Sequence, residues 1–200
     1  MRTRNLIQRL GIPIVLAGAL LSPYQARADE SSKLNKDKIS YIARDSDFSQ
    51  DSDETLLARM LFGEARSCSL QEKIHIAYTA INRTRDGKKW NGENLREVIL
   101  CPKQYSCFND GDPNLPKLRD PLKCDKEQWK ECLQVASFVI AYRQREADPT
   151  EGATHYHTSS MKRYPKWTKS EEVQNLGISE VGRDEEGNPI ISKHIFYREN

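Results

Sequence analysis

The chain has 200 residues, 37% of them hydrophobic, and carries 31 Lys and Arg against 29 Asp and Glu. Its first 28 residues hold four arginines and no acid, so the remainder has a net charge of about −2. This balance argues against nucleic acid as the main partner, because phosphate binding needs a basic surplus or stripe.

Residues 1–28 have the pattern of a secretory signal. Three arginines precede an apolar run at residues 10–21, and Ala26-Arg27-Ala28 fits a cleavage site before Asp29. The apolar run is shorter than the roughly 20 residues that span a bilayer. We therefore expect an exported protein, periplasmic or secreted, without stable membrane insertion. An uncleaved membrane anchor is the alternative.

Residues 29–52 are polar and rich in Ser, Asp and Lys, which predicts a flexible lead-in. The remaining residues, 53–200, have the length of one domain.

The first predicted helix carries a carboxylate among apolar residues. Leu57, Met60, Leu61 and Glu64 are spaced so that they share one helix face. A carboxylate there costs free energy unless it is paired or functional, and a buried carboxyl suits a proton donor. The alternative is that the helix frays at Gly63 and Glu64 faces water.

Three further helices begin at capping patterns. These patterns are Ser69 with Glu72 for a helix through Arg83, Asn94 with Glu97 for a short helix before Pro102, and Asp125 with Gln128 for a long helix to about Arg145. Residues 153–158, 178–183 and 190–197 have the composition of strands, with a hairpin turn at 184–188. The expected fold class is α+β, mostly helical, with a small antiparallel sheet toward the C-terminus.

Two short segments have the composition of binding sites. The loop containing Gln104, Tyr105 and Ser106 mixes amide, aromatic and hydroxyl groups, as sugar-binding loops do. On a strand, His155 and His157 point to one face and Tyr156 to the other. Two such histidines could share a zinc ion, but hydrogen-bonded or ligand-binding histidines are commoner, so we expect no metal.

Five cysteines follow the signal segment: Cys68, Cys101, Cys107, Cys124 and Cys132. An oxidising compartment predicts disulfide bonds, and the odd number leaves one thiol over. Cys101–Cys107 and Cys124–Cys132 close the shortest loops, but the connectivity stays open. No Cys-x-x-Cys pair supports a zinc ribbon.

Taken together, six motifs in this order resemble the cell wall hydrolase family typified by the spore cortex-lytic enzyme SleB. They are Phe62-Gly63-Glu64-Ala65-Arg66, Ile81-Asn82-Arg83, Pro102-x-Gln104-Tyr105-Ser106-Cys107, Asp148 to His157, Pro165-x-Trp167 and Lys193-His194-x-Phe196-Tyr197-Arg198. The resemblance covers about residues 53–198. The chain departs from the family at Ser67-Cys68, where Gly-Glu is common, and at Ser192, where glycine is usual.

The resemblance implies a lysozyme-like fold that cuts peptidoglycan glycan strands without a cofactor. Glu64 would be the catalytic acid of a lytic transglycosylase acting between N-acetylmuramic acid and N-acetylglucosamine. Motif position suggests that Gln104, Tyr105 and Ser106 orient the N-acetyl groups and that Tyr156, with His155 or His157, closes the other wall. Asn82 is expected to bond to backbone near the Glu64 helix.

Other functions stay open at this point. A second carboxylate from Asp110 or Asp112 would give a muramidase-type hydrolase, because ordinary glycosidases use two carboxylates. The rivals in other classes are a zinc-dependent N-acetylmuramoyl-L-alanine amidase, a non-catalytic wall-binding protein, and an effector or phage-derived lysin with the same chemistry. Oligomeric state is not predicted.

Overall fold

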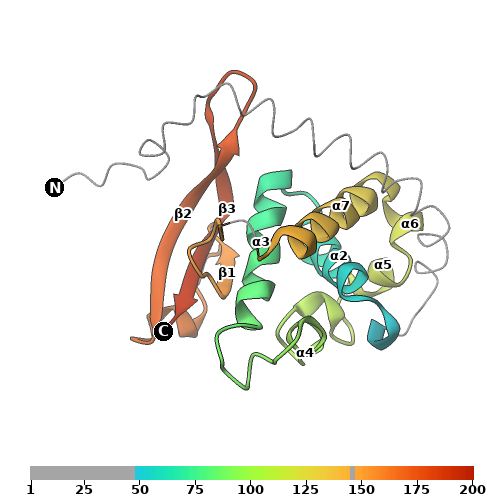
Figure 1. Ribbon diagram of the computed structural model, residues 1–200, viewed down its shortest axis with the longest axis horizontal. Helices are drawn as coiled ribbons and strands as arrows, with labels where there is room; N and C mark the ends of the chain where they lie inside the picture. The colour runs from blue at the N-terminus through green and yellow to red at the C-terminus, as the bar shows by residue number, and fades with distance from the viewer. Residues whose placement is uncertain (1–47, 145–146) are drawn as a thin grey trace. The chain divides into compact units, whose positions relative to one another are not determined.

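Helices fill the first part of the domain and strands the last part (Figure 1). The computed structural model describes residues 48–144 and 147–200. The predicted signal segment and residues 29–47 of the lead-in lie outside the described residues. The α+β class with a small C-terminal antiparallel sheet is confirmed.

The predicted helix starts are confirmed because each has its capping side chain in place. Ser69, Asn94 and Asp125 each accept a hydrogen bond from the backbone N–H three residues later, and Ser52 does the same at the start of the first helix. The helices they begin are α2 (Asp53–Glu64), α3 (Leu70–Arg83), α4 (Leu95–Leu100) and α7 (Lys126–Tyr142).

The short elements were not predicted, because fewer than six residues cannot show a helical period. They are η2 (Phe48–Gln50), η3 (Ser106–Phe108), α5 (Leu115–Arg119), α6 (Pro121–Cys124) and η4 (Lys166–Lys169). Both α5 and α6 have a proline in their first turn, where no backbone donor is needed.

Three antiparallel strands form the sheet in the order β1-β3-β2: β1 (His155–Thr158), β2 (Val173–Arg183) and β3 (Pro189–Glu199). Tyr156 pairs with Phe196, which fixes the face of the sheet on which each β1 side chain lies. The hairpin turn is confirmed by the bond from Asp184 N–H to Asn188 O at 3.0 Å. β2 begins five residues before the predicted strand. Its first residues lack alternation, but they pair with the end of β3.

Helix α3 lies between the sheet and the other long helices (Figure 1). Most of α2 is buried, and Phe62 meets Trp129 of α7 edge to face at 5.9 Å. Burying each such side chain contributes about 1.5–3 kcal/mol, so α2 is the centre of the core. Glu64 therefore stands at the end of a helix that is mostly buried.

Residues 48–52, which the sequence placed in the lead-in, lie against this core. Phe48 packs edge to face on Phe108 at 5.3 Å, and buried Asp51 pairs with buried Arg59 at 2.6 Å. The domain thus includes a few residues before position 53.

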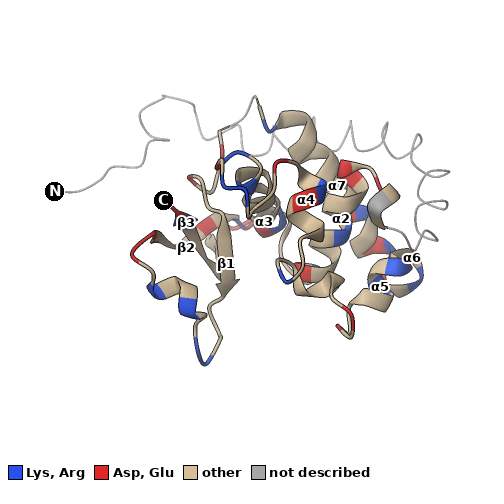
Figure 2. Ribbon diagram, turned by 90° about the horizontal axis from the view of Figure 1, so that it is seen from below, with Lys and Arg blue, Asp and Glu red and all other residues tan. Residues whose placement is uncertain are grey.

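Acidic and basic residues alternate over the ribbon (Figure 2). The local basic run of Lys162, Arg163, Lys166 and Lys169 is exposed, as expected of a solvated loop. Among the described residues, no helix has the length and apolar character needed to cross a membrane.

Candidate functional site

Glu64 is the last residue of α2 and is half-buried. The helix continues through Gly63, and its end is closed by the bond from Ala65 N–H to Leu61 O at 2.8 Å. The alternative in which the helix frays before Glu64 is therefore wrong. The carboxylate emerges where the helix meets the loop around η3.

Gly63 allows that loop to lie close to α2. A Cβ atom at Gly63 would stand 2.6 Å from both Cβ and Sγ of Cys107. The resulting close approach puts the Cys107 N–H 3.5 Å from Glu64 Oε1. Burial, followed by the charge of Glu64, raises the pKa of the Cys107 thiol, so it stays protonated beside the carboxylate.

Arg83, the last residue of α3, joins the two walls around Glu64. Its Nε donates to Thr154 O at 2.6 Å and its Nη1 to Gln104 Oε1 at 2.6 Å. The guanidinium also lies over the ring of Tyr105, 5.3 Å from its centroid. One buried side chain therefore fixes the loop before η3 relative to the start of β1.

Two tyrosines stand near Glu64 in their neutral form. Burial raises the pKa of Tyr105, and burial and then the Glu64 carboxylate raise the pKa of Tyr156 well above its usual value. Both are hydroxyl donors across the working pH range. Tyr105 is only 3% exposed, so it holds the loop in place, whereas Tyr156 is half-buried.

The predicted alternation along β1 is confirmed, and it divides the three predicted residues between two faces. Tyr156 contacts His194 at 5.3 Å and Phe196 at 6.2 Å, on the face that packs against α3. His155 lies 5.0 Å from Trp167, and His157 stacks on Tyr197 at 5.3 Å. The two histidines are thus on the sheet face away from Tyr156.

Each histidine of β1 has a hydrogen-bond partner. His157 Nε2 lies 2.9 Å from the hydroxyl of Tyr197, and His155 Nδ1 lies 2.9 Å from the hydroxyl of Thr154. Burial lowers the pKa of His155 to about 4, helped by the charges of Arg83 and Lys88. Both are satisfied histidines of an aromatic cluster.

The sequence suggested that Asn82 bonds to backbone near the Glu64 helix, but its hydrogen bonds lie elsewhere. Its amide lies 2.8 Å from Asp148 Oδ2 and 2.9 Å from Ala153 O. Asp148 also accepts from Thr150 N–H and Gly152 N–H, each at 2.8 Å. Asn82 and Asp148 therefore shape the turn that leads into β1 rather than the end of α2.

The two aspartates considered as second carboxylates differ in position. Asp112 is half-buried. Burial and the charge of Glu64 are the main causes of the raised pKa of Cys107, and the charge of Asp112 adds to them. Its Oδ1 accepts from Asn114 N–H at 2.8 Å. Asp110 is exposed. Asp112 is thus engaged in the turn before α5.

The expected disulfide bonds are absent, because all five cysteines are free thiols in the structure. Cys107 is buried against Gly63 of α2, and Cys132 is buried on α7. Burial raises the pKa of Cys132 to about 12. These two cysteines serve as apolar packing groups, which the count of cysteines alone could not indicate.

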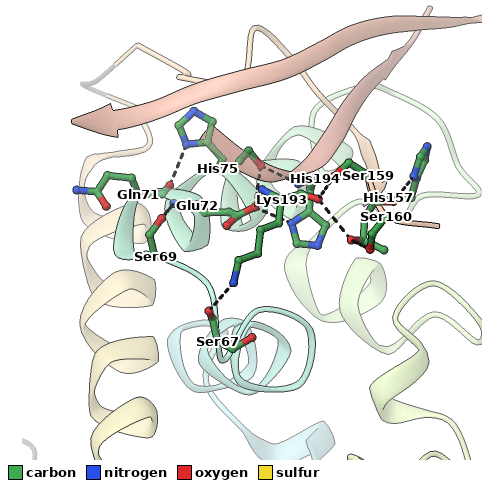
Figure 3. A network of polar contacts seen from close by, with 12 residues as sticks. Ser67, Ser69, Gln71, Glu72, His75, His157, Ser159, Ser160, Lys193 and His194 are labelled. Atoms are coloured by element: carbon green, nitrogen blue, oxygen red, sulfur yellow. Dashed lines mark hydrogen bonds and ion pairs between the residues drawn. The ribbon is translucent and has the colours of Figure 1, made fainter. Parts of the chain in front are cut away.

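A second polar network joins the start of α3 to β3 (Figure 3). Buried Glu72 accepts at Oε1 from Ser192 Oγ at 2.7 Å and from Lys193 N–H at 2.6 Å, and His194 Nδ1 lies 2.8 Å away. Burial alone would raise the pKa of Glu72, but these hydrogen bonds outweigh it and lower the pKa to about 2. Ser192, the departure from glycine, thus has a bonding role.

A family model described as Cell Wall Hydrolase matches residues 68–180 of the chain. This is more than half of the sequence. The chain belongs to the cell wall hydrolase family. No curated protein and no solved structure matches. Membership assigns the chain a general role in hydrolysing the peptidoglycan of cell walls.

In this cell wall hydrolase, the matched residues include the loop of Gln104 and the strand of Tyr156, while Glu64 lies four residues before the match. Gln104 bonds to Arg83, and the charge of Glu64 acts on Tyr156, whereas His155 and His157 lie on the opposite face of the sheet.

Sequence reasoning missed two residues of this junction, Arg83 and Cys107. Both stood in the quoted motifs, but Arg83 was given no role and Cys107 was considered only as a disulfide partner. Arg83 could have been noticed as a cation at the end of a helix with an apolar face. A guanidinium that is buried there needs acceptors from elsewhere in the chain.

Proposed function

We propose that this cell wall hydrolase cleaves the glycan strand between N-acetylmuramic acid and N-acetylglucosamine, as a lytic transglycosylase with Glu64 as its single acid and base. The proposal places it among enzymes of the SleB type, exported to the periplasm or secreted. The observation that carries it is the setting of Glu64, half-buried at a helix end beside a backbone N–H, a protonated thiol and two neutral tyrosines.

The reaction needs only one carboxyl group. Protonated Glu64 gives its proton to the glycosidic oxygen as the bond from that oxygen to C1 of the muramic acid breaks. The C6 hydroxyl of the same sugar then attacks C1, and its proton passes to the Glu64 carboxylate. The product is a 1,6-anhydro ring, and Glu64 is returned to its starting form.

The other residues bind and position the sugar. Ser106 is exposed and would bond to an N-acetyl group directly, whereas the amide of Gln104 is held by Arg83 and Asn91 and would shape the wall beside it. Tyr156 donates from the opposite wall. Tyr105 acts by supporting Arg83, and His155 and His157 act by holding β1 through the aromatic cluster.

A muramidase-type hydrolase is the second candidate, because the charge of Asp112, like that of Glu64, raises the pKa of the Cys107 thiol. A hydrolase would use that carboxylate to activate water.

Mass spectrometry of soluble products from purified peptidoglycan separates these reactions. Muropeptides that end in 1,6-anhydro-muramic acid support the proposal. Products heavier by one water, with reducing muramic ends, would show a muramidase. Released stem peptides would show an amidase, and binding to peptidoglycan without soluble product would show a wall-binding protein.

A further inference from the structure

Three side chains of types that bind metal ions lie close together beside the turn that follows α2. Cys68 comes from the turn after α2, Glu72 from the first turn of α3 and His194 from β3. One donor atom from each lies within 4.8 Å of the other two. Glu72 and His194 are buried and Cys68 is half-buried. Segments more than 120 residues apart thus bring a thiol, a carboxylate and an imidazole to one point.

The positions of the carboxylate and the imidazole are fixed before any ligand arrives. The hydrogen bonds from Ser192 Oγ and Lys193 N–H and the contact with His194 Nδ1 all meet at Glu72 Oε1. Figure 3 shows Glu72 and His194 pointing toward one another, with the Lys193 side chain reaching past them to Ser67 O. Ser192 and Lys193 thus hold the Glu72 carboxylate in place, as outer-shell groups hold the ligands of metal sites.

The cluster also has access to solvent. Cys68 lines a cavity of about 460 Å³ that also contacts Arg66, Asp125 and Glu131. An ion can therefore reach the Cys68 thiol from this cavity.

The Cys68 thiol is free in the structure, so no disulfide bond competes for it. A bound metal ion would take it as a thiolate, because a coordinating thiol loses its proton.

We propose that Cys68, Glu72 and His194 bind a zinc ion. Sulfur, nitrogen and carboxylate oxygen at bond lengths of about 2.0–2.3 Å stand about 3.3–3.6 Å apart around tetrahedral zinc. The donor atoms of the three residues lie within 4.8 Å of one another. Zinc would replace the hydrogen bond between Glu72 and His194, whose atoms stand 2.8 Å apart, and would draw in the Cys68 sulfur. A water molecule would complete the four ligands.

This site differs from the histidine pair of β1, which the sequence singled out for a metal and then set aside. Bound zinc would also link Cys68, which lies four residues after Glu64, to His194 of β3. With zinc bound at this site, the expectation of an enzyme without a cofactor would not hold for this chain.

Cobalt titration of the purified metal-free protein tests the site without any glycan, so the outcome is independent of the proposed reaction. We expect one Co²⁺ per chain with a thiolate-to-cobalt charge-transfer band. Cys68→Ser should remove the band and weaken competition by zinc at least about 100-fold. Cys124→Ser changes an exposed thiol outside the cluster and should leave both unchanged.

A second measurement does not depend on a variant. Zinc should protect Cys68 of the unaltered protein from alkylation while Cys124 remains reactive. The absence of a thiolate band, a band that survives Cys68→Ser, or alkylation of Cys68 at the same rate with and without zinc would overturn the proposal.

Discussion

Gly63 and Cys107 fit together so closely that no side chain can be added between them. A Cβ atom on Gly63 would lie 2.6 Å from two atoms of Cys107, one of them the sulfur. Because the backbone of Cys107 also contacts Glu64, this packing sets the distance between the carboxylate and the η3 loop.

Gly63→Ala should therefore destabilise the protein although alanine favours helix. The gain in helix propensity is up to about 1 kcal/mol, whereas overpacking costs about 1–3 kcal/mol. We expect a net loss of stability in urea unfolding and at least a tenfold loss of lytic activity. Adding Cys107→Gly should make the two effects less than additive. Full additivity would show that the two positions do not press on one another.

Arg83→Lys should weaken the link between the loop before η3 and the start of β1. A lysine cannot donate to Thr154 O and Gln104 Oε1 in the same planar arrangement. We expect about 1–3 kcal/mol less stability and a fall in activity beyond what unfolding explains. Arg85→Lys, on the exposed side two residues later, is the matched control and should behave as the parent. Equal effects at the two positions would contradict the role given to Arg83.

Asp112→Asn tests whether a second carboxylate takes part. Asparagine can still accept from Asn114 N–H, so the turn before α5 should keep its form. A lytic transglycosylase with one acid should retain its rate within about twofold, as should exposed Asp110→Asn. A loss of about 100-fold in Asp112→Asn alone, together with reducing ends in the products, would assign the protein to the hydrolases.

His155 should make the protein sensitive to mild acid. Its pKa is lowered to about 4 by burial and by nearby cations, while an unfolded histidine titrates near 6.5. Between these values the unfolded chain binds more protons, so stability is complete above about pH 6.5 and falls as the pH drops toward 4. Because His155 is half-buried, we expect a change of about 1–2 kcal/mol.

His155→Gln should remove this part of the pH dependence. Urea unfolding at pH 7 and pH 4 would give a smaller drop in the variant than in the parent protein. Parallel curves would show that the histidine does not contribute to acid sensitivity.

The sequence predicted the parts of this fold that depend on local hydrogen bonds. Capping side chains act on groups three residues away, so Ser69 and Asn94 marked the starts of α3 and α4 correctly. The alternation of β1 follows from strand geometry alone. Short helices and the first half of β2 were missed, because their order comes from packing and from pairing with β3.

The candidate site was predicted only where one residue stood out from its own element. Glu64 did so on an apolar helix face. Arg83 did not, since its partners Gln104 and Thr154 lie 21 and 71 residues further along the chain. For the same reason nothing local linked Cys68 and Glu72 to His194. The disulfide expectation failed because it rested on the compartment rather than on contacts between cysteines.

Glu64→Gln tests the central claim most directly. The change removes the proton donor and keeps the shape of the side chain, so the circular dichroism spectrum and thermal unfolding should match those of the parent protein. Release of soluble muropeptides from purified peptidoglycan should fall at least about 1000-fold. Glu127→Gln, on the exposed first turn of α7, should release products at the parent rate. A folded Glu64→Gln protein that still produces anhydro-muropeptides would contradict the account.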